Sequence, residues 1–217
     1  MVLPSNAFIR YFFGLVITFA CLTADLHADH PPDGAQKTKP ALTVGLYPLL
    51  SKNMMQFRNQ PLADFLQRTE TANVQLKYLN SYQSFLSQGL VAKHDVIVAP
   101  SHFAMLFSQY KPLLLLDFEL TALIVSLRSG AVHHTGQLPD KTLAIANKIA
   151  LVSLVGLDHL EQQDVAIDTI SLLKKSTHDR ALHALFTGHA DAAIISNSFF
   201  LNLPKKTSAK LRIIYQS

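Results

Sequence analysis

From Ala41 onward, short apolar runs alternate with longer stretches whose apolar residues recur every three or four positions. The short runs are typical of buried β-strands and the longer stretches of amphipathic helices. In the first half the pattern predicts strands at 42–47, 74–78 and 95–99, separated by helices at 61–68 and 82–91. Because strands joined by helices favour parallel pairing, we predict an α/β fold with parallel-dominated sheets flanked by helices.

Local signals support both of these helices. Pro61 suits a first helical turn, and Ser81 is placed to cap the amides that open the helix at 82–91. We expect the apolar stripes of the two helices to be buried in the core: Leu62, Phe65, Leu66, Phe85, Leu86 and Leu90.

The pattern then changes and repeats. After a short helix at 102–109 and a strand at 113–118, a second strand at 122–127 follows almost at once, so we place a hinge at 119–121. The second half predicts strands at 142–146, 165–170, 190–195 and 211–215, with helices at 152–160 and 178–187. We therefore predict a first lobe over 41–120, completed by a return strand at 210–217, and a second lobe over 121–209.

The N-terminal region has a different composition. Arg10 precedes an apolar run at 11–22, and small-residue sites end at Ala24 and Ala28. A run of about 12 apolar residues is too short to span a bilayer comfortably, so this order is typical of a secretory signal peptide. We predict a signal peptide over 1–28, cleaved after Ala28, and a flexible Pro-rich tether over 29–40. An uncleaved anchor and lipid attachment at Cys21 are the alternatives.

Composition argues against several classes of function. The net charge is +4, but Lys and Arg are scattered, which argues against a nucleic-acid partner. The single cysteine lies in the predicted leader, so we expect neither a disulfide nor a thiolate site in the mature chain. The ten histidines form no His-Glu-x-x-His pattern, and no nucleophile elbow or Gly-rich phosphate loop occurs. We expect no metal, no cofactor and no catalytic residues.

Five segments occur in an order that is similar to a known family. They are Val44–Leu49, Pro61–Leu66, Asp95–Phe103, Thr177–Leu182 and Gly188–Ala193. Together they resemble the phosphate, phosphite and phosphonate substrate-binding proteins of ABC transporters, which have the type II periplasmic binding fold, and the likeness covers 41–217. The resemblance implies a periplasmic protein whose two lobes close on a small anion or zwitterion and deliver it to an inner-membrane permease.

The resemblance also implies candidate ligand contacts. Tyr47 ends the first parallel strand, on the side of an open α/β sheet where ligands bind. Phe103 is a candidate wall of the ligand cleft, and Ser101 a candidate contact or helix cap. In the second lobe, His178 and Asp191 are candidate contacts. The alternatives are packed rings for the two aromatic residues, a helix-start residue for His178, and a turn or salt bridge for Asp191.

Two departures from the family change the expectation. The stretch 147–153 stands where the family has an anion loop rich in Ser and Thr, but here most hydroxyls are missing. Backbone amides including that of Ala150, with Lys148 or Ser153, remain to hold an anion. We therefore expect weak binding of phosphate and simple phosphonates.

The second departure is that the family continues after the last strand with helices that pack on the first lobe, whereas this sequence ends there. The resemblance implies a C-terminally shortened member whose first lobe exposes apolar surface. A periplasmic sensory or accessory ligand-binding module without a transport role is the alternative function, and a poorly folded remnant is a third.

Overall fold

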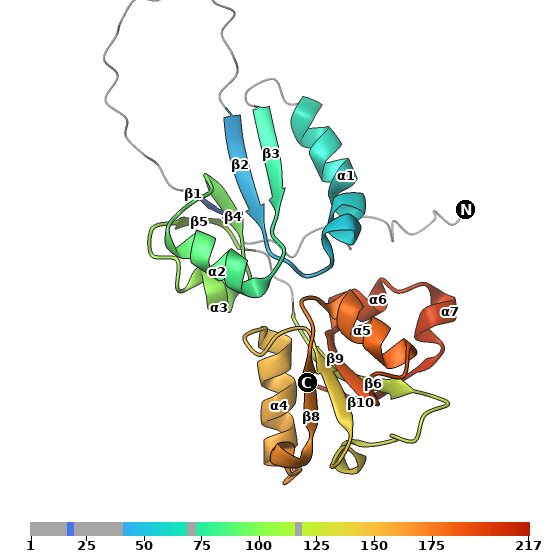
Figure 1. Cartoon of the computed structure of the whole chain (residues 1–217). Coiled ribbons are helices and arrows are strands. Elements are labelled where there is room, and N and C mark those ends of the chain that lie inside the picture. Colours follow the sequence, from blue (N-terminus) through green and yellow to red (C-terminus); the bar gives the residue numbers. More distant parts are fainter. Residues whose placement is uncertain (1–16, 20–40, 69–72, 116–118) are drawn as a thin grey trace, which may run out of the picture. The chain divides into compact units, whose positions relative to one another are not determined.

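The computed structural model describes residues 17–19, 41–68, 73–115 and 119–217. Contacts group the chain into two units, each containing one five-stranded sheet (Figure 1). Unit 1 consists of Met1–Tyr47, Gln60–Lys77 and Leu86–Phe118, and unit 2 of Pro48–Asn59, Tyr78–Phe85 and Glu119–Ser217. The boundary after Phe118 falls just before the predicted hinge. None of the described helices is long and apolar enough to cross a membrane.

Sheet A belongs to unit 1 and has the strand order β3-β2-β4-β1-β5. Its strands are β1 (Ile17–Phe19), β2 (Ala41–Leu46), β3 (Asn73–Tyr78), β4 (Val96–Val98) and β5 (Lys111–Leu114). β2 and β4 are parallel, while β1 is antiparallel to both β4 and β5. β4 is buried along its whole length, because its three residues are all β-branched and apolar and lie inside the sheet. The predicted strand at 113–118 begins two residues earlier than expected, and residues 116–118 lie outside the described residues.

The first helix, α1, differs from the prediction. It runs from Lys52 to Arg68, so Pro61 lies inside it rather than in its first turn. None of its residues is buried, and Phe65 is 62% exposed. The expected burial of its apolar stripe is therefore wrong, since the helix presents no side chain fully to a core.

The next two helices, α2 (Tyr82–Leu90) and α3 (Ser101–Ala104), follow the prediction in part. The Ser81 hydroxyl accepts the N–H of Ser84, which confirms the predicted cap of α2. Phe85 is buried, but Leu90 is 47% exposed. The buried face of the helix includes Phe85 and Gly89, and Leu90 lies beside this face. A Cβ at Gly89 would lie 2.4 Å from the Phe107 ring, so only glycine permits this close approach.

Sheet B belongs to unit 2 and has the strand order β10-β6-β9-β7-β8. β6 is antiparallel to both of its neighbours, whereas β7 is parallel to β8 and β9. The strands are β6 (Ala122–Leu127), β7 (Thr142–Ile145), β8 (Ser171–Lys174), β9 (Ala192–Ser196) and β10 (Leu211–Gln216). The helices are α4 (Leu151–Gln162), α5 (His178–Phe186), α6 (Asn197–Leu201) and α7 (Lys205–Ser208), with 3₁₀ turns at Thr135–Gln137 and Ile167–Thr169.

Each face of sheet B carries its own hydrophobic core, because alternate residues of a strand point to opposite faces. On one face, Leu143 and Ile194 pack with Val152 of α4. On the other, Ala144 and Ala193 pack with residues of α5. Figure 1 shows the two helices on opposite sides of the sheet. A Cβ at Gly156 of α4 would lie 2.8 Å from Ile194, so α4 approaches the sheet closely there.

Two predicted elements of the second half are corrected. The apolar run at 165–170 is not a strand: Val165 and Ile170 reach the core from either side of the 3₁₀ helix at Ile167–Thr169, and β8 begins only at Ser171. The predicted return strand, β10, does not join sheet A but pairs antiparallel with β6 inside unit 2. The segment at 48–59 also groups with unit 2, because Leu50 is part of the core that α5 covers.

Candidate ligand-binding site

The three parallel strands of sheet B have their carboxyl ends on the same side of the sheet, which we call the carboxyl edge. β7 pairs in register with β8 and β9, so the carboxyl ends of all three lie side by side. The next helix after each of these strands is α4, α5 or α6 respectively, so three helices begin at this edge. Helix N-termini carry unpaired amides and partial positive charge, which makes such an edge the expected position for an anionic ligand.

The start of α4 is open to an acceptor. Ala150 precedes the helix in extended conformation, and its carbonyl accepts the N–H groups of Ser153 at 2.9 Å and Leu154 at 3.0 Å. The amides of Leu151 and Val152 come before the first of these bonds, and they have no acceptor among the described residues. Two adjacent backbone donors are therefore left at this helix start.

Polar residues flank these two amides in the sequence. The Asn147 side chain accepts the N–H of Ile149 at 3.1 Å and donates to Gln83 Oε1 at 3.1 Å, which fixes the loop before α4. Lys148 is exposed in that loop. Ser153 Oγ is buried and has no hydrogen-bond partner within the described part of the chain. Because leaving a buried hydroxyl unpaired costs about 1–3 kcal/mol, this group favours an incoming acceptor.

The first residues of α5 are already hydrogen-bonded to another segment of the chain. Asp179 Oδ1 accepts the N–H of Ser51 at 2.9 Å, and the His178 N–H donates to Leu49 O at 3.3 Å. Burial alone raises the pKa of Asp179, but hydrogen bonds from Ser51 and Thr177 outweigh it, so the pKa lies below its usual value. The carboxylate is thus ionised and compensates the positive end of the helix.

His178 is a core residue. Its ring is 1% exposed and stacks on Phe199 at a centroid distance of 6.1 Å. Burial lowers the pKa of His178 to about 4, although the nearby Asp179 and a hydrogen bond to Ile194 act in the opposite direction. The side chain is therefore neutral at pH 7 and buried, which favours a structural role over a ligand contact.

Asp191 lies at the opposite edge of sheet B. It directly precedes β9, and its Oδ2 accepts the N–H of Thr142 at 2.8 Å, while its own N–H donates to Thr142 O at 2.8 Å. Both residues stand at the amino ends of their strands. The structure therefore separates Asp191 from Ala150 and Ser153, and it gives the carboxylate a strand-tethering role.

In unit 1, three predicted residues follow β2 or β4 in the chain. The Tyr47 N–H donates to Val98 O at 3.2 Å, and the Tyr47 ring lies 5.8 Å from that of Phe103. Phe103 is 2% exposed and stacks nearly parallel on Phe107, so it is a core ring and not a wall facing solvent. Ser101 is exposed and is the first residue of α3, so it is not the cap of that helix. Half-buried Tyr47 and exposed Ser101 are the accessible candidates.

Sequence reasoning missed Asn197, which follows β9. Its side chain accepts the N–H of Thr121 at 3.2 Å and donates to Glu119 O at 3.2 Å, and its own N–H donates to Thr121 O. It therefore holds the segment that we predicted as the hinge. The available signal was a polar Ser-Asn-Ser sequence directly after a buried strand, in which Ser196 caps α6.

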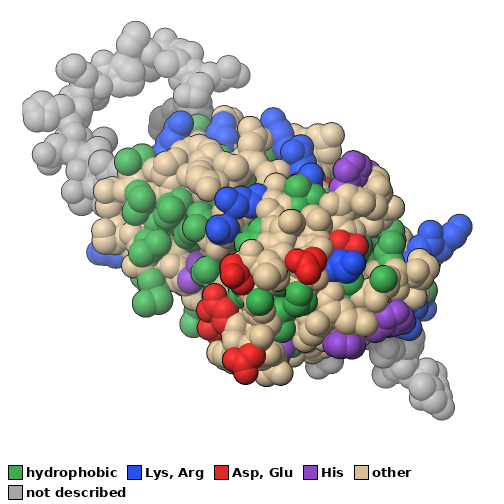
Figure 2. Space-filling model, turned by 60° about the horizontal axis from the view of Figure 1, so that its bottom comes forward, with side chains coloured by type: hydrophobic (Ala, Val, Ile, Leu, Met, Phe, Trp, Pro, Cys, Tyr) green, Lys and Arg blue, Asp and Glu red, His purple; other side chains and the backbone are tan. Residues whose placement is uncertain are grey.

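A groove of about 540 Å³ lies elsewhere on unit 2, where β6 ends and β10 begins. Its lining combines apolar and basic side chains and includes Arg128, Phe200, Lys205, Leu211, Arg212 and Ile213. On the face seen in Figure 2, Lys and Arg side chains lie in separate groups with acidic side chains near some of them. No group of three or more potential metal ligands converges within the described residues.

Two α/β sheets of this topology, with helices beginning at the carboxyl ends of their parallel strands, are the arrangement of the type II periplasmic binding fold. A family model for the periplasmic substrate-binding protein of phosphonate ABC transporters matches residues 44–217, so the chain belongs to that family. The family is one of substrate-binding proteins and is not an enzyme family. Among curated protein sequences, none matches this chain.

Solved structures show the same fold at low sequence identity. A binding protein component of an ABC phosphonate transporter from Pseudomonas aeruginosa is 12% identical with a TM-score of 0.69, over 82% of this chain and 65% of that one. PhnD1 from Prochlorococcus marinus, in complex with methylphosphonate, is 14% identical with a TM-score of 0.68, over 82% and 72%. The CcmR regulatory domain from Synechocystis, in complex with 2-PG, is 12% identical with a TM-score of 0.53, over 81% and 80%.

Proposed function

We propose that the protein is an extracytoplasmic solute-binding component of an ABC transporter and that the start of α4 holds the anionic group of its solute. The observation that carries this proposal is the difference between two helix starts at one edge of sheet B. The first turn of α5 is closed by Leu49 and Ser51, whereas the amides of Leu151 and Val152 at α4 have no acceptor among the described residues.

The donors at α4 limit what this site binds well. Besides the two amides, the exposed ammonium of Lys148 and the buried hydroxyl of Ser153 are available. An oxyanion such as phosphate has more acceptor sites than this set satisfies, and each unmet one costs about 1–3 kcal/mol. Losing two donors weakens binding roughly a hundredfold or more. We therefore propose a larger anion or zwitterion whose apolar part contacts half-buried Leu151.

Titration of the full chain tests this choice of ligand. Phosphate, methylphosphonate, longer alkylphosphonates, sulfonates and amino acids are compared by calorimetry and by the rise in melting temperature. Lys148→Ala is expected to weaken the best anion severalfold, and Lys205→Ala, in the separate basic groove, is the matched control. Submicromolar affinity for phosphate or methylphosphonate would refute the expected weakness, and equal effects of the two substitutions would refute the site.

We also propose how the protein reaches its place of action. Residues 1–28 direct export, residues 29–40 act as a tether, and an inner-membrane permease is the partner. Membership of a periplasmic binding family supports this location. In spheroplasts the chain is expected to be digested by added protease; protection equal to that of a cytoplasmic marker contradicts export.

A sensory or accessory module is the alternative function. It is favoured by the similarity of the fold to the CcmR regulatory domain, which was solved with a small ligand. The two functions differ in their consequences for the cell. Deleting the gene is expected to abolish uptake of the solute if the protein serves transport. Unchanged uptake with an altered transcriptional response to the solute would support the sensory function instead.

A further inference from the structure

The two sheets have the same arrangement of five strands. The fourth strand comes from the N-terminal region in sheet A and from the middle of the chain in sheet B. Read from β8, sheet B is β8-β7-β9-β6-β10, and sheet A is β3-β2-β4-β1-β5. In both, the second and third strands are parallel, the fourth is antiparallel to the third, and the fifth is antiparallel to the fourth. β1 therefore stands in sheet A where β6 stands in sheet B.

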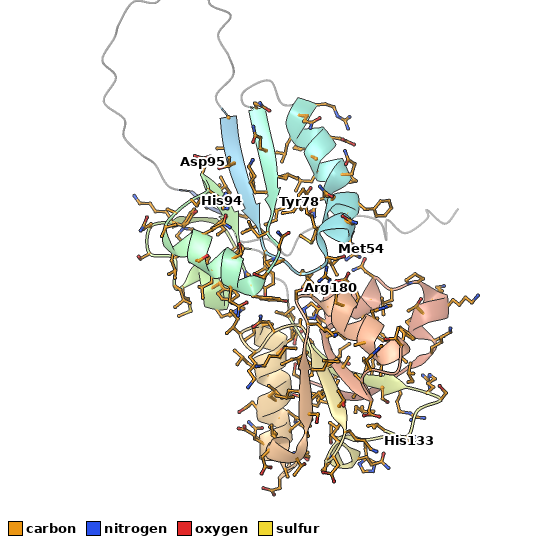
Figure 3. The ribbon with its side chains drawn as sticks, viewed as in Figure 1. Met54, Tyr78, His94, Asp95, His133 and Arg180 are labelled. Carbon is orange, nitrogen blue, oxygen red and sulfur yellow. The ribbon has the colours of Figure 1, made fainter. Side chains whose placement is uncertain are left out.

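A matching hydrogen bond supports the equivalence of the sheets. Asp95, which is labelled in Figure 3, stands directly before β4 and accepts the N–H of Thr43 in β2 at 2.7 Å. Asp191, directly before β9, accepts the N–H of Thr142 in β7 at 2.8 Å. Each carboxylate joins the third strand of its sheet to the second at the amino end. Two sheets aligned by the same contact are expected to need the same five strands.

The fourth strand connects the sheet to its edge. In sheet B, five of the six residues of β6 are buried, and the strand pairs with both β9 and β10. In sheet A, β4 and β5 are not neighbours: Phe19 pairs with Val96 of β4 on one side and with Lys111 of β5 on the other. Without β1, fully buried β4 would leave unpaired backbone groups, which are costly away from water.

We propose that residues 17–19 are a structural strand of the folded protein, which occupy a strand-binding slot between β4 and β5. The slot takes an apolar segment antiparallel to both neighbours, and in this chain the N-terminal apolar run supplies it. β5 is joined to the rest of sheet A through this strand, so its order depends on the slot being filled.

This role competes with processing of the N-terminus. Cleavage after Ala28 would separate residues 17–19 from the sheet that they complete. The proposal therefore favours the alternative in which the apolar run stays attached to the folded chain. Folded, extracytoplasmic protein is expected to have a mass that includes residues 17–19. Protein that starts at Asp29 and still protects the amides of β4 and β5 from hydrogen exchange would overturn the proposal.

A disulfide tests the pairing directly in the full chain. Thr18 is the cross-strand partner of Pro112, and antiparallel partners have Cα separations of about 4.5–5.5 Å, within the range that a disulfide needs. With Cys21→Ser to remove the native thiol, Thr18→Cys with Pro112→Cys is expected to oxidise readily to an intramolecular disulfide. Thr23→Cys with Pro112→Cys is the matched control and is expected to form at least tenfold less. Equal yields in the two variants would overturn the pairing.

Hydrogen exchange tests whether the strand matters to the sheet. Thr18→Pro removes a ladder donor and disfavours the strand, so amides of β4 and β5 such as those of Ile97 and Leu113 are expected to exchange at least tenfold faster. Thr23→Pro is the control, and the amides of β6 report whether unit 2 stays folded. If Thr18→Pro leaves β4 and β5 as protected as Thr23→Pro does, the strand has no structural role, whatever the disulfide yield.

Discussion

Replacing Leu151 by proline removes one ligand donor at the start of α4 without removing a helix hydrogen bond. Leu151 is the first residue of α4, a position where proline is well tolerated. Ala150 before it has φ −70° and ψ 130°, the extended conformation that a residue preceding proline prefers. The deleted amide has no acceptor among the described residues, so the fold loses no bond with it.

The expected loss follows from the charge of the acceptor. A hydrogen bond to a charged group contributes about 1.5–3 kcal/mol, which corresponds to roughly a tenfold to hundredfold change in Kd. Leu151→Ala is the matched control, because it shortens the side chain and keeps the amide. Both variants are expected to melt within a few degrees of each other, and only Leu151→Pro is expected to lose affinity.

NMR titration with methylphosphonate measures this difference even when binding is weak, and the tightest anion of the ligand panel provides a second probe. Kd is compared between Leu151→Pro and Leu151→Ala at constant ionic strength, because salt screens interactions between charges. Equal Kd values for two folded variants would refute the assignment of this amide to the ligand.

Three further predictions concern stability and surface. Burial lowers the pKa of His178 to about 4, so below about pH 6.5 the unfolded chain binds a proton that the folded chain does not. The free energy of unfolding is therefore highest above pH 6.5. It falls by about 3 kcal/mol as the pH drops toward 4. Denaturant melts should show this slope in wild type and in exposed His183→Gln, but not in His178→Phe. Asp191→Ala should cost about 1–2 kcal/mol of unfolding free energy and leave Kd for methylphosphonate unchanged; a large loss of affinity in a stable variant would restore a ligand role. Because Phe65 and Met105 are 62% and 85% exposed, the chain is expected to bind a hydrophobic dye or to dimerise, and a dye-silent monomer would contradict this.

Much of the fold follows from local pattern. β2, β6, β7, β9 and β10 lie within one or two residues of their predicted positions, because each is a short segment rich in apolar residues. The predicted starts of α2 and α5 are also confirmed, since a polar residue precedes an apolar stripe in both. The strand predicted at 165–170 was wrong because its apolar residues enter the core from a 3₁₀ helix and the residues beside it, and composition does not distinguish that from a strand.

The site was harder to predict because it depends on pairing between distant segments. The N–H of His178 donates to Leu49 O, more than a hundred positions away, and the carboxylate of Asp191 accepts the N–H of Thr142 from another strand. Neither contact can be predicted from the sequence around His178 or Asp191. The helix start after Ala150 was predictable, since a strand followed by a helix start is a local signal, but the Ala150 amide donates to Asn147 O at 3.2 Å and is not one of the open donors. β1 was not, because an apolar segment suited to a sheet has the same composition as an export signal.

Helix α1 is expected to be the part of the protein most susceptible to proteolysis. Its 17 residues include an internal proline and no buried side chain. Pro61 has no N–H to donate to the preceding turn, and few tertiary contacts replace that bond, so α1 opens at a lower free energy cost than the strands. Limited trypsin digestion is expected to nick the chain first at Arg58 or Arg68, while both sheets persist as a clipped but folded protein.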